Sequence, residues 1–466
     1  MNLPAGVHSM LEAAATADVY RRTGTIVRIA GETVTARGIN LRPGELAIAE
    51  DPSGRPIALQ ATGSHGGEAI LSSLDRGTVT AGARILATGV LASAPTGPSA
   101  LGRVIDALGR PLDGGFDLDA ARWAPSAAEP PEPLTRRPIV GAVATGVRAI
   151  DGLLTLGRGQ RVGVFAGSGV GKSTLLGMMA RGTSADVNVI ALVGERGREV
   201  RDFIERDLGP DALRKSVVVT ATGDTPAAMR VTAANAATAI AEGFRDDGRD
   251  VLLLFDSLTR VAIAQREIGL AAGEPPAMRG YPPSVFSRLP HLMERSGPGA
   301  TGSITAVYTI LVDGDDMEDP IADLARATLD GHIVLDRALA NSGQYPPINV
   351  LTSVSRLMPR LVDGLHGQAA RHIRSLLAAY NEARDLVNIG AYVSGSDPAV
   401  DESLHLMPAI RAFLQQDAVG IAPFEDTVAA LLDLAGIDAA QMGDPVATGG
   451  TAEAEAVEGE FAEVPA

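Results

Sequence analysis

The sequence predicts an α/β protein with a parallel sheet covered by helices, a small N-terminal β-barrel before it and a C-terminal helical domain after it. Three observations support this fold class. Short β-rich runs separated by Gly, Pro and Asp-Pro fill residues 20–92, as in a small antiparallel barrel. Strand and helix patterns alternate from about residue 145 to residue 356, which places an α/β domain at residues 93–362. Helical periodicity then dominates residues 363–440.

The two ends of the chain are expected to lie outside these domains. Residues 1–19 contain one short helical pattern, too brief to be stable alone, and we interpret them as a docking segment. Residues 441–466 are predicted to be a disordered acidic tail, because the last 22 residues carry five glutamates and no basic residue. A proline-rich stretch at residues 123–138 indicates a rigid connector on the surface.

Composition disfavours several classes of function. The net charge of −16 argues against a general nucleic-acid-binding surface, because affinity for phosphate backbones comes from clustered Lys and Arg. The absence of cysteine excludes disulfides, thiolate metal sites and cysteine nucleophiles. No apolar run approaches the roughly 20 residues of a membrane span, and the N-terminus lacks a basic region followed by an apolar core. We therefore expect a cytosolic protein.

A glycine-rich loop at residues 166–173, AGSGVGKS, predicts a phosphate-binding site. It lies between a strand pattern at 160–165 and a helical pattern at 173–181, the context that such a loop requires. Glycines there let backbone N–H groups approach a phosphate, whose charge the helix N-terminus favours. The loop starts with Ala where the strict pattern has Gly. The predicted nucleotide-binding residues are Gly167, Ser168, Gly169, Val170, Gly171, Lys172, Ser173 and Thr174, and the Ser173 hydroxyl is a Mg²⁺ ligand.

Lysine usage supports this assignment. Only Lys172 and Lys215 are lysines among the 40 lysine and arginine residues. A compact, mobile ammonium can reach between phosphate oxygens where a rigid guanidinium fits poorly. The chain therefore keeps one of its two lysines where that chemistry needs it.

Two carboxylates follow predicted strands. The apolar run 251–256 ends in Asp256, a Mg²⁺ candidate that alternatively caps the next helix. Glu195 follows the run 189–194 and is a candidate for polarising the water that attacks the γ-phosphate. Because Glu195 belongs to a charged cluster at 195–199, a solvated turn is the alternative there.

Several motifs together resemble one known family, the ATPases of the type III export apparatus, over about residues 20–440. They are the phosphate loop, GERGREV at 194–200, DSLTR at 256–260, GEPPAMRGYPPSVFSRLP at 273–290, DGHIVLDR at 330–337 and PPINVLTSVS at 346–355. The family belongs with the rotary ATP synthase α and β subunits, whose signature the last motif fits. The run IVLDRALANSGQYPP is most similar to flagellum-specific export ATPases, and the injectisome ATPases of virulence secretion are close behind.

The resemblance implies a RecA-like P-loop core in a homohexameric ring, with Mg-ATP hydrolysed at the subunit interfaces. Lys172 and Ser173 would hold phosphates and Mg²⁺, and Glu195 would activate water. Asp256 would hold the metal through water. The other implied site residues are Arg196 and Arg260 for the γ-phosphate network, Tyr345 for stacking on adenine, and Arg356 as an arginine finger given to the neighbouring subunit.

The resemblance also implies partners. Residues 273–283 match the part of the family that lines the central pore, so a coiled-coil stalk is expected there. The first 20 or so residues would bind a regulatory dimer that holds the enzyme peripherally at the inner-membrane export gate, where it would meet export substrates and their chaperones.

Other functions compete with an export ATPase, flagellar or virulence-type. A non-catalytic nucleotide-binding ring subunit would lack Glu195, typically having glutamine. An RNA-translocating hexamer is disfavoured by the net negative charge of the chain and by the lack of base-stacking aromatic residues. A purely structural docking ring would not need so complete a set of hydrolytic groups.

Overall fold

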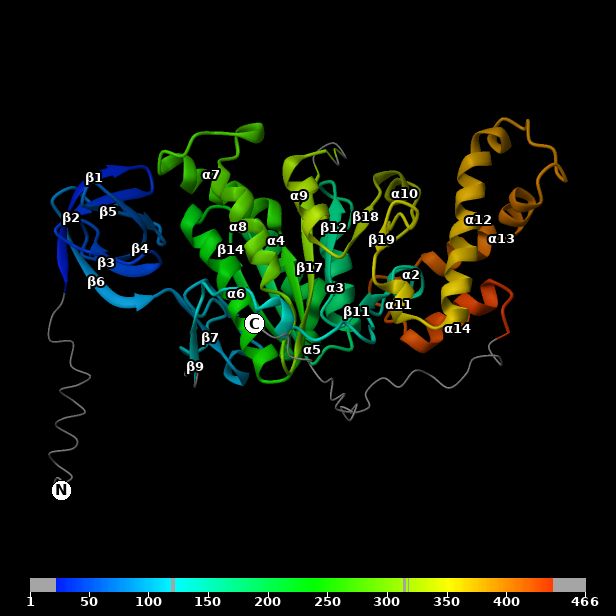
Figure 1. The fold of residues 1–466 in the computed structure, drawn as a ribbon, viewed down its shortest axis with the longest axis horizontal. Helices are drawn as coiled ribbons and strands as arrows, with labels where there is room; N and C mark the ends of the chain where they lie inside the picture. The colour runs from blue at the N-terminus through cyan, green and yellow to red at the C-terminus, as the bar shows by residue number, and fades with distance from the viewer. Residues whose placement is uncertain (1–21, 119–121, 313–315, 317, 439–466) are drawn as a thin grey trace, which may run out of the picture.

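The structure, a computed structural model, describes residues 22–118, 122–312, 316 and 318–438. Within them a barrel, a sheet with helices on both faces and a helical region follow one another along the longest axis (Figure 1). The predicted docking segment 1–19 and the acidic tail 441–466 lie outside the described residues. No helix in the described part of the chain is long and apolar enough to cross a membrane.

The first six strands form a closed antiparallel barrel in the order β1-β2-β5-β4-β3-β6 (blue in Figure 1). Its interior is filled by aliphatic side chains such as Ile57, Leu59 and Ile85, all fully buried. The strands are β1 (Thr23–Ala30), β2 (Thr33–Arg37), β3 (Glu45–Glu50), β4 (Pro56–His65), β5 (Glu68–Ser73) and β6 (Arg84–Leu91).

The central sheet has the order β19-β18-β12-β17-β15-β13-β14-β8, with all neighbours parallel except the edge pair β18 and β19. Its strands are β8 (Val104–Ile105), β12 (Arg161–Ala166), β13 (Val187–Val193), β14 (Ser216–Ala221), β15 (Asp250–Asp256), β17 (Ser303–Leu311), β18 (Gly331–Leu335) and β19 (Val354–Ser355). The short β16 (Gly297–Pro298) pairs with β17, and two small ladders join β7 (Ser93–Thr96) to β9 (Arg122–Pro125) and β10 (Ala142–Val143) to β11 (Leu156–Gly157).

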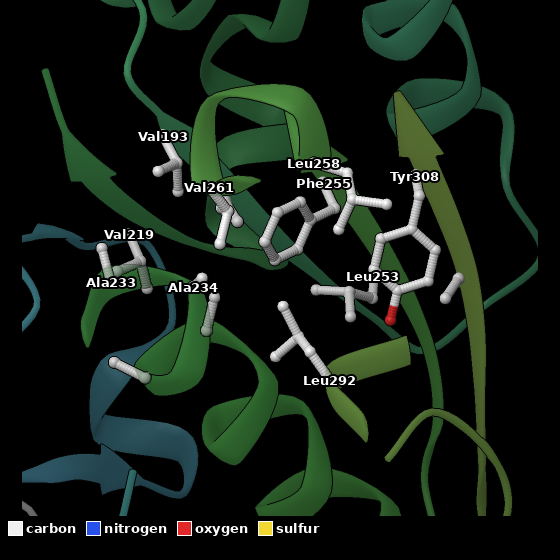
Figure 2. Packing of buried hydrophobic residues seen from close by; sticks show 14 of the residues in the cluster. Val193, Val219, Ala233, Ala234, Leu253, Phe255, Leu258, Val261, Leu292 and Tyr308 are labelled. Carbon is white, nitrogen blue, oxygen red and sulfur yellow. The ribbon is translucent and has the colours of Figure 1, made fainter. Parts of the chain in front are cut away.

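Helices bury both faces of this sheet, which is why its strands are mostly apolar on both faces. One face packs against α6 (Ala227–Asp246), α7 (Leu258–Ala271), α8 (Pro283–Glu294) and α9 (Pro320–Thr328). Figure 2 shows this core, where Phe255 and Tyr308 lie between the strands and the helices that carry Val261 and Leu292. The other face packs against α2 (Arg148–Leu153), α3 (Lys172–Gly182), α5 (Gly209–Arg214) and the C-terminal helices.

The C-terminal region contains α12 (Gly364–Asn388), α13 (Pro398–Leu414) and α14 (Phe424–Leu434), which pack on one another and on α2. The remaining short helices are η1 (Pro98–Ala100), η2 (Pro133–Thr135), α4 (Gly197–Asp202), the π-helix η3 (Phe203–Leu208), η4 (Met278–Gly280), α10 (Arg337–Asn341) and α11 (Met358–Leu361).

The segment 348–355 is rich in β-branched residues but forms a strand only at its last two residues, β19. The cause is a side chain that competes with the ladder, because Asn349 Oδ1 accepts the backbone N–H groups of Leu351 and Thr352, each at 3.2 Å. These bonds turn the chain where β-propensity alone favours an extended run.

A buried ion pair ties α6 to the end of α8. Arg295 is fully buried and donates two hydrogen bonds to the Glu242 carboxylate, at 2.9 and 2.6 Å. The guanidinium also reaches the carbonyl oxygen of Ser126, at 2.9 Å, and the side chain of Asn235, at 3.1 Å. The Arg295 side chain thereby links the start of the proline-rich connector, residues 123–138, to helices α6 and α8.

Replacing Glu242 by Ala is expected to lower the free energy of unfolding by about 3–5 kcal/mol, because it leaves the Arg295 charge buried without its partner. Urea denaturation monitored by circular dichroism measures the loss. Glu68→Ala is the matched control, since Glu68 pairs with an exposed Arg37 and its loss should cost at most about 1 kcal/mol. Equal, small losses in the two variants would refute the role of the buried pair.

Candidate active site

The phosphate loop joins β12 to α3 at the carboxyl edge of the central sheet. Gly169 and Gly171 have φ of +78° and +105°, left-handed values that side-chain-bearing residues rarely adopt. Among the described residues, none accepts a hydrogen bond from the backbone N–H groups of residues 169–173. The loop is therefore a cradle of free N–H donors at a helix N-terminus, which suits a phosphate group.

Lys172 lies between two carboxylates from neighbouring strands. Its Nζ donates to Asp256 Oδ1 and, at 3.3 Å, to Glu195 Oε1. The three side chains are only 11%, 3% and 13% exposed, respectively for Lys172, Asp256 and Glu195. Thr309 adds a hydrogen bond to Asp256 at 2.9 Å. The structure thus brings these three side chains together.

Burial and charge act in opposite directions on this cluster. Burial by itself lowers the pKa of Lys172, but the charges and hydrogen bonds of Asp256 and Glu195 outweigh it and raise that pKa above the usual value. Burial raises the pKa of Asp256, the Lys172 charge opposes this, and the nearby Glu195 charge adds to the increase. The lysine is thus held as a cation, which the site needs to bind an anion.

Neither alternative reading of the two carboxylates fits their surroundings. The N-cap of α7 is Ser257, whose hydroxyl accepts the Arg260 N–H at 3.3 Å, so Asp256 is not the helix cap. Glu195 is partly buried against Lys172, with its side chain only 13% exposed, whereas a solvated turn would leave it exposed. The solvated-turn description holds for Arg196 and Arg198, whose side chains are 81% and 79% exposed.

The structure brings Arg260 to the site and turns Arg196 away from it. Arg260 packs against Gly194, where a β-carbon would lie 2.7 Å from the Arg260 Cβ, and its buried Nε has no hydrogen-bond partner within the described part of the chain. Arg196 instead pairs with Glu199 at 3.2 Å.

The oxygen groups present fit a magnesium ion bound together with nucleotide phosphates. Mg²⁺ is usually held by one or two protein oxygens, waters and substrate phosphates. Ser173 at the start of α3 and Asp256 at the end of β15 provide such oxygens. Consistent with this sparse donor set, no group of three or more His, Cys, Asp or Glu that could hold a metal by itself occurs among the described residues.

A cavity of about 780 Å³ lies between Tyr345 and the C-terminal region. The Tyr345 side chain is 52% exposed, and its carbonyl oxygen accepts the Gln416 N–H at 2.8 Å. The same segment approaches the phosphate loop, since a β-carbon on Gly171 would lie 3.9 Å from Pro347 Cδ. Sequence reasoning missed Arg148 and Gln416, which also line the cavity, because they belong to no motif and meet only in the fold.

Arg356 lies far from the phosphate loop of its own chain. Its backbone N–H donates to the Asp330 carbonyl at 3.2 Å and its guanidinium to the Arg326 carbonyl at 3.1 Å. Asp330 precedes β18 and contacts Arg161 at the start of β12, whereas the loop follows the end of that strand. At about 3.3 Å per residue the strand separates the two by roughly 17 Å.

Family models match two regions of the chain. The model described as ATP synthase alpha/beta family, nucleotide-binding domain, matches residues 146–355, and that of the T3SS EscN ATPase C-terminal domain matches residues 362–433.

Curated relatives match nearly the whole chain. The flagellum-specific ATP synthase of Bacillus subtilis is 49% identical over 431 residues, which are 92% of this chain and 98% of that protein. The type 3 secretion system ATPase of Xanthomonas euvesicatoria is 49% identical over 426 residues, 89% and 94% of the two chains.

Solved structures of EscN from the enteropathogenic E. coli type III secretion system have the same fold. The assembled ATPase superposes with a TM-score of 0.83 at 43% identity, covering 88% of this chain and 100% of that one. Its complex with the central stalk EscO gives a TM-score of 0.82 at the same identity of 43% and the same coverage.

Lys172→Ala is expected to abolish ATP turnover, because no other cation of the right reach would stabilise the charge that develops on the transferred phosphoryl group. Lys172→Arg should also abolish turnover, because the guanidinium keeps the positive charge but lacks the compact shape of the ammonium. Phosphate release from ATP measures both variants. Lys215→Ala is the control, as that lysine contacts the Thr183 carbonyl, away from the loop. Near-normal turnover by Lys172→Ala would make the site assignment wrong.

Proposed function

This chain belongs to the ATP synthase alpha/beta family, within the flagellum-specific and type 3 secretion ATPases, and from that premise we propose that it hydrolyses Mg-ATP to energise flagellar type III protein export. The single observation that carries the proposal is the cluster of Lys172, Glu195 and Asp256 beside the cradle of backbone N–H donors. Such a cluster combines a phosphate-binding cation with a carboxylate able to orient water.

In the proposed reaction each residue of the site has one task. Backbone N–H groups of the loop and the Lys172 ammonium hold the β- and γ-phosphates. Glu195 accepts a hydrogen bond from the attacking water and orients it toward the γ-phosphorus. Arg260, packed against Gly194, supports the γ-phosphate network. Arg196, which the sequence also assigned to this network, pairs with Glu199 in solvent and has no place in the proposed site. Ser173 and, near it, Asp256 would hold Mg²⁺, which would supply positive charge against the phosphate oxygens.

The base of the nucleotide is proposed to occupy the cavity beside Tyr345. The half-exposed ring of Tyr345 offers a flat surface for stacking on adenine. Tyr345 lines this cavity, and Pro347, two residues on, approaches Gly171 of the phosphate loop, which supports placing the base there.

Completion of the site is proposed to need a second copy of the chain. Arg356 is exposed at the sheet edge and is remote from its own phosphate loop, so it can serve as a finger only for a neighbouring subunit. This supports a homohexameric ring with nucleotide at each interface. The assembled form of EscN is a precedent.

The partners are proposed on the same grounds. Residues 273–283, largely exposed between α7 and α8, would face a coiled-coil stalk in the central pore, as EscN has a complex with its stalk EscO. Residues 1–19 would bind a regulatory dimer and dock the ring peripherally at the inner-membrane export gate, where export substrates and chaperones arrive.

The proposed domains are 20–92, 93–362 and 363–440, which contain, respectively, the barrel, the central sheet and helices α12 to α14.

A virulence-type secretion ATPase is the second candidate, favoured by the 49% identity to the Xanthomonas euvesicatoria protein. Deletion of the gene in its native host separates the two. Loss of flagellar filaments and swimming supports the flagellar assignment. Normal swimming with loss of effector secretion overturns it.

Glu195→Gln should still bind Mg-ATP but hydrolyse it at least about 10²-fold more slowly, the usual scale for losing a positioned base. Binding of a fluorescent ATP analogue and steady-state turnover are measured in parallel. If affinity and rate fell together, Glu195 would be a structural residue. Glu199→Gln serves as control, because Glu199 pairs with the exposed Arg196.

Arg356→Ala and Lys172→Ala should each be inactive alone, since a finger contributes about 10³–10⁵-fold to rate. Mixed 1:1, random rings would pair an intact Lys172 with a neighbour's intact Arg356 at about one interface in four, so ATPase activity should partly return. Turnover of the mixture is compared with each variant alone. Failure to recover, in mixed rings shown to form, would argue against independently working sites completed by the neighbour.

A further inference from the structure

The turn at residues 222–227 connects the Glu195 loop to the N-terminal barrel. It follows β14 and leads into α6. On one side the backbone N–H of Gly223 donates to the Glu195 carbonyl oxygen at 3.0 Å. On the other side the Asp224 carboxylate pairs with Arg76, which lies in the barrel loop between β5 and β6. One short turn thus contacts both the proposed water-orienting residue and the barrel.

The contact with the Glu195 loop is too close for any side chain. A β-carbon on Gly223 would lie 2.9 Å from the carbonyl oxygen of Gly194. That atom belongs to the backbone, so relieving the clash would shift the peptide that leads into Glu195. The N–H of Gly194 in turn donates to the Ala221 carbonyl oxygen at 2.7 Å, at the start of the same turn. The position of the Glu195 backbone therefore follows the position of the turn.

The barrel in turn holds the start of α6. The Glu32 carboxylate, in the hairpin between β1 and β2, accepts the Ala227 N–H at 2.9 Å. The N-cap residue Pro226 supplies no side-chain cap, so a residue of the barrel satisfies this helix terminus. Thr232, one turn further along α6, donates to Gln60 of β4 at 3.1 Å. In Figure 1 the barrel lies beside the region of helices α6 and α7.

We propose that the N-terminal barrel positions the catalytic Glu195 through this turn. Gly223 and Asp224 are the positioning residues on the turn, and Arg76 and Glu32 are those on the barrel. The inference rests on the proposed role of Glu195. Within the described residues no hydrogen bond joins the turn to the phosphate loop, so a displaced barrel changes the rate of hydrolysis and leaves nucleotide binding unchanged.

The exposed ion pair provides variants that fold, since its side chains are 60% and 66% exposed. Arg76→Ala and Asp224→Ala should each lower kcat about 2- to 5-fold, the range that a surface pair can supply, with KM for ATP unchanged. The exchanged pair, Arg76→Asp with Asp224→Arg, should restore the rate. Gly223→Ala should lower kcat about 10²-fold, because it misplaces the Glu195 backbone.

Two controls separate positioning from general effects. Arg37→Ala breaks an exposed pair with Glu68 that lies wholly within the barrel, and it should leave kcat unchanged. Glu32→Gln keeps an acceptor for the Ala227 N–H and should retain more activity than Glu32→Ala, which removes the acceptor.

The decisive measurement repeats Arg76→Ala in the Glu195→Gln background. Because the positioned carboxylate has gone, Arg76→Ala should cause no further loss of the residual rate. The positioning role is overturned if Arg76→Ala lowers kcat by the same factor in the Glu195→Gln background as in the wild type. It is also overturned if Arg76→Ala, Asp224→Ala and Gly223→Ala leave kcat unchanged. Either result leaves the proposed function intact. Wild-type turnover by Glu195→Gln itself would overturn the proposed function, and the inference with it.

Discussion

A buried lysine paired with two carboxylates constrains the rest of this molecule. Taking the Lys172 ammonium out of water costs more than the small net stability of a domain unless anions are close to it. Asp256 and Glu195 supply them because β15 and β13 end at the same edge of the sheet as β12. The chemistry of the site thus depends on the register of strands that are distant in sequence.

The register in turn depends on the burial of both sheet faces. Along β15, Leu252 and Leu254 point to one apolar cluster, and Leu253 and Phe255 to the other. A slip of one residue would exchange the two faces and move Asp256 away from Lys172. The alanine-rich α6 packs on the second face, where Ala233 and Ala234 are completely buried, and small side chains there let the helix approach the strands closely (Figure 2).

The same helix relates the site to the rest of the chain. The turn before α6 donates a hydrogen bond to the Glu195 carbonyl oxygen. Asp224 of this turn and Ala227, the first residue of α6, both contact side chains of the barrel. At the opposite edge of the sheet Arg356 follows β19, and its guanidinium donates to the Arg326 carbonyl oxygen. The cluster around Lys172 therefore lies in the interior of one chain, between the barrel at one edge of the sheet and Arg356 at the other.

The sequence alone determined the local parts of this arrangement. The glycines at 169 and 171, the lysine that follows them, the apolar strand that precedes Glu195 and the one that ends at Asp256 could be recognised because a few consecutive residues fix each of them. The fold class followed from periodicity for the same reason. Composition does not reveal where a side chain competes with the backbone, as Asn349 does when it turns a segment rich in β-branched residues.

Only the tertiary structure decided which of the predicted residues meet. It placed Glu195 against Lys172 but left Arg196 in solvent, although the two residues are adjacent in the chain. It also brought Arg148 and Gln416 to one cavity and Arg76 to Asp224, pairs that no motif connects. The physical reason is that side-chain proximity across strands and domains depends on packing and register, which arise from burial over the whole chain and not from local spacing.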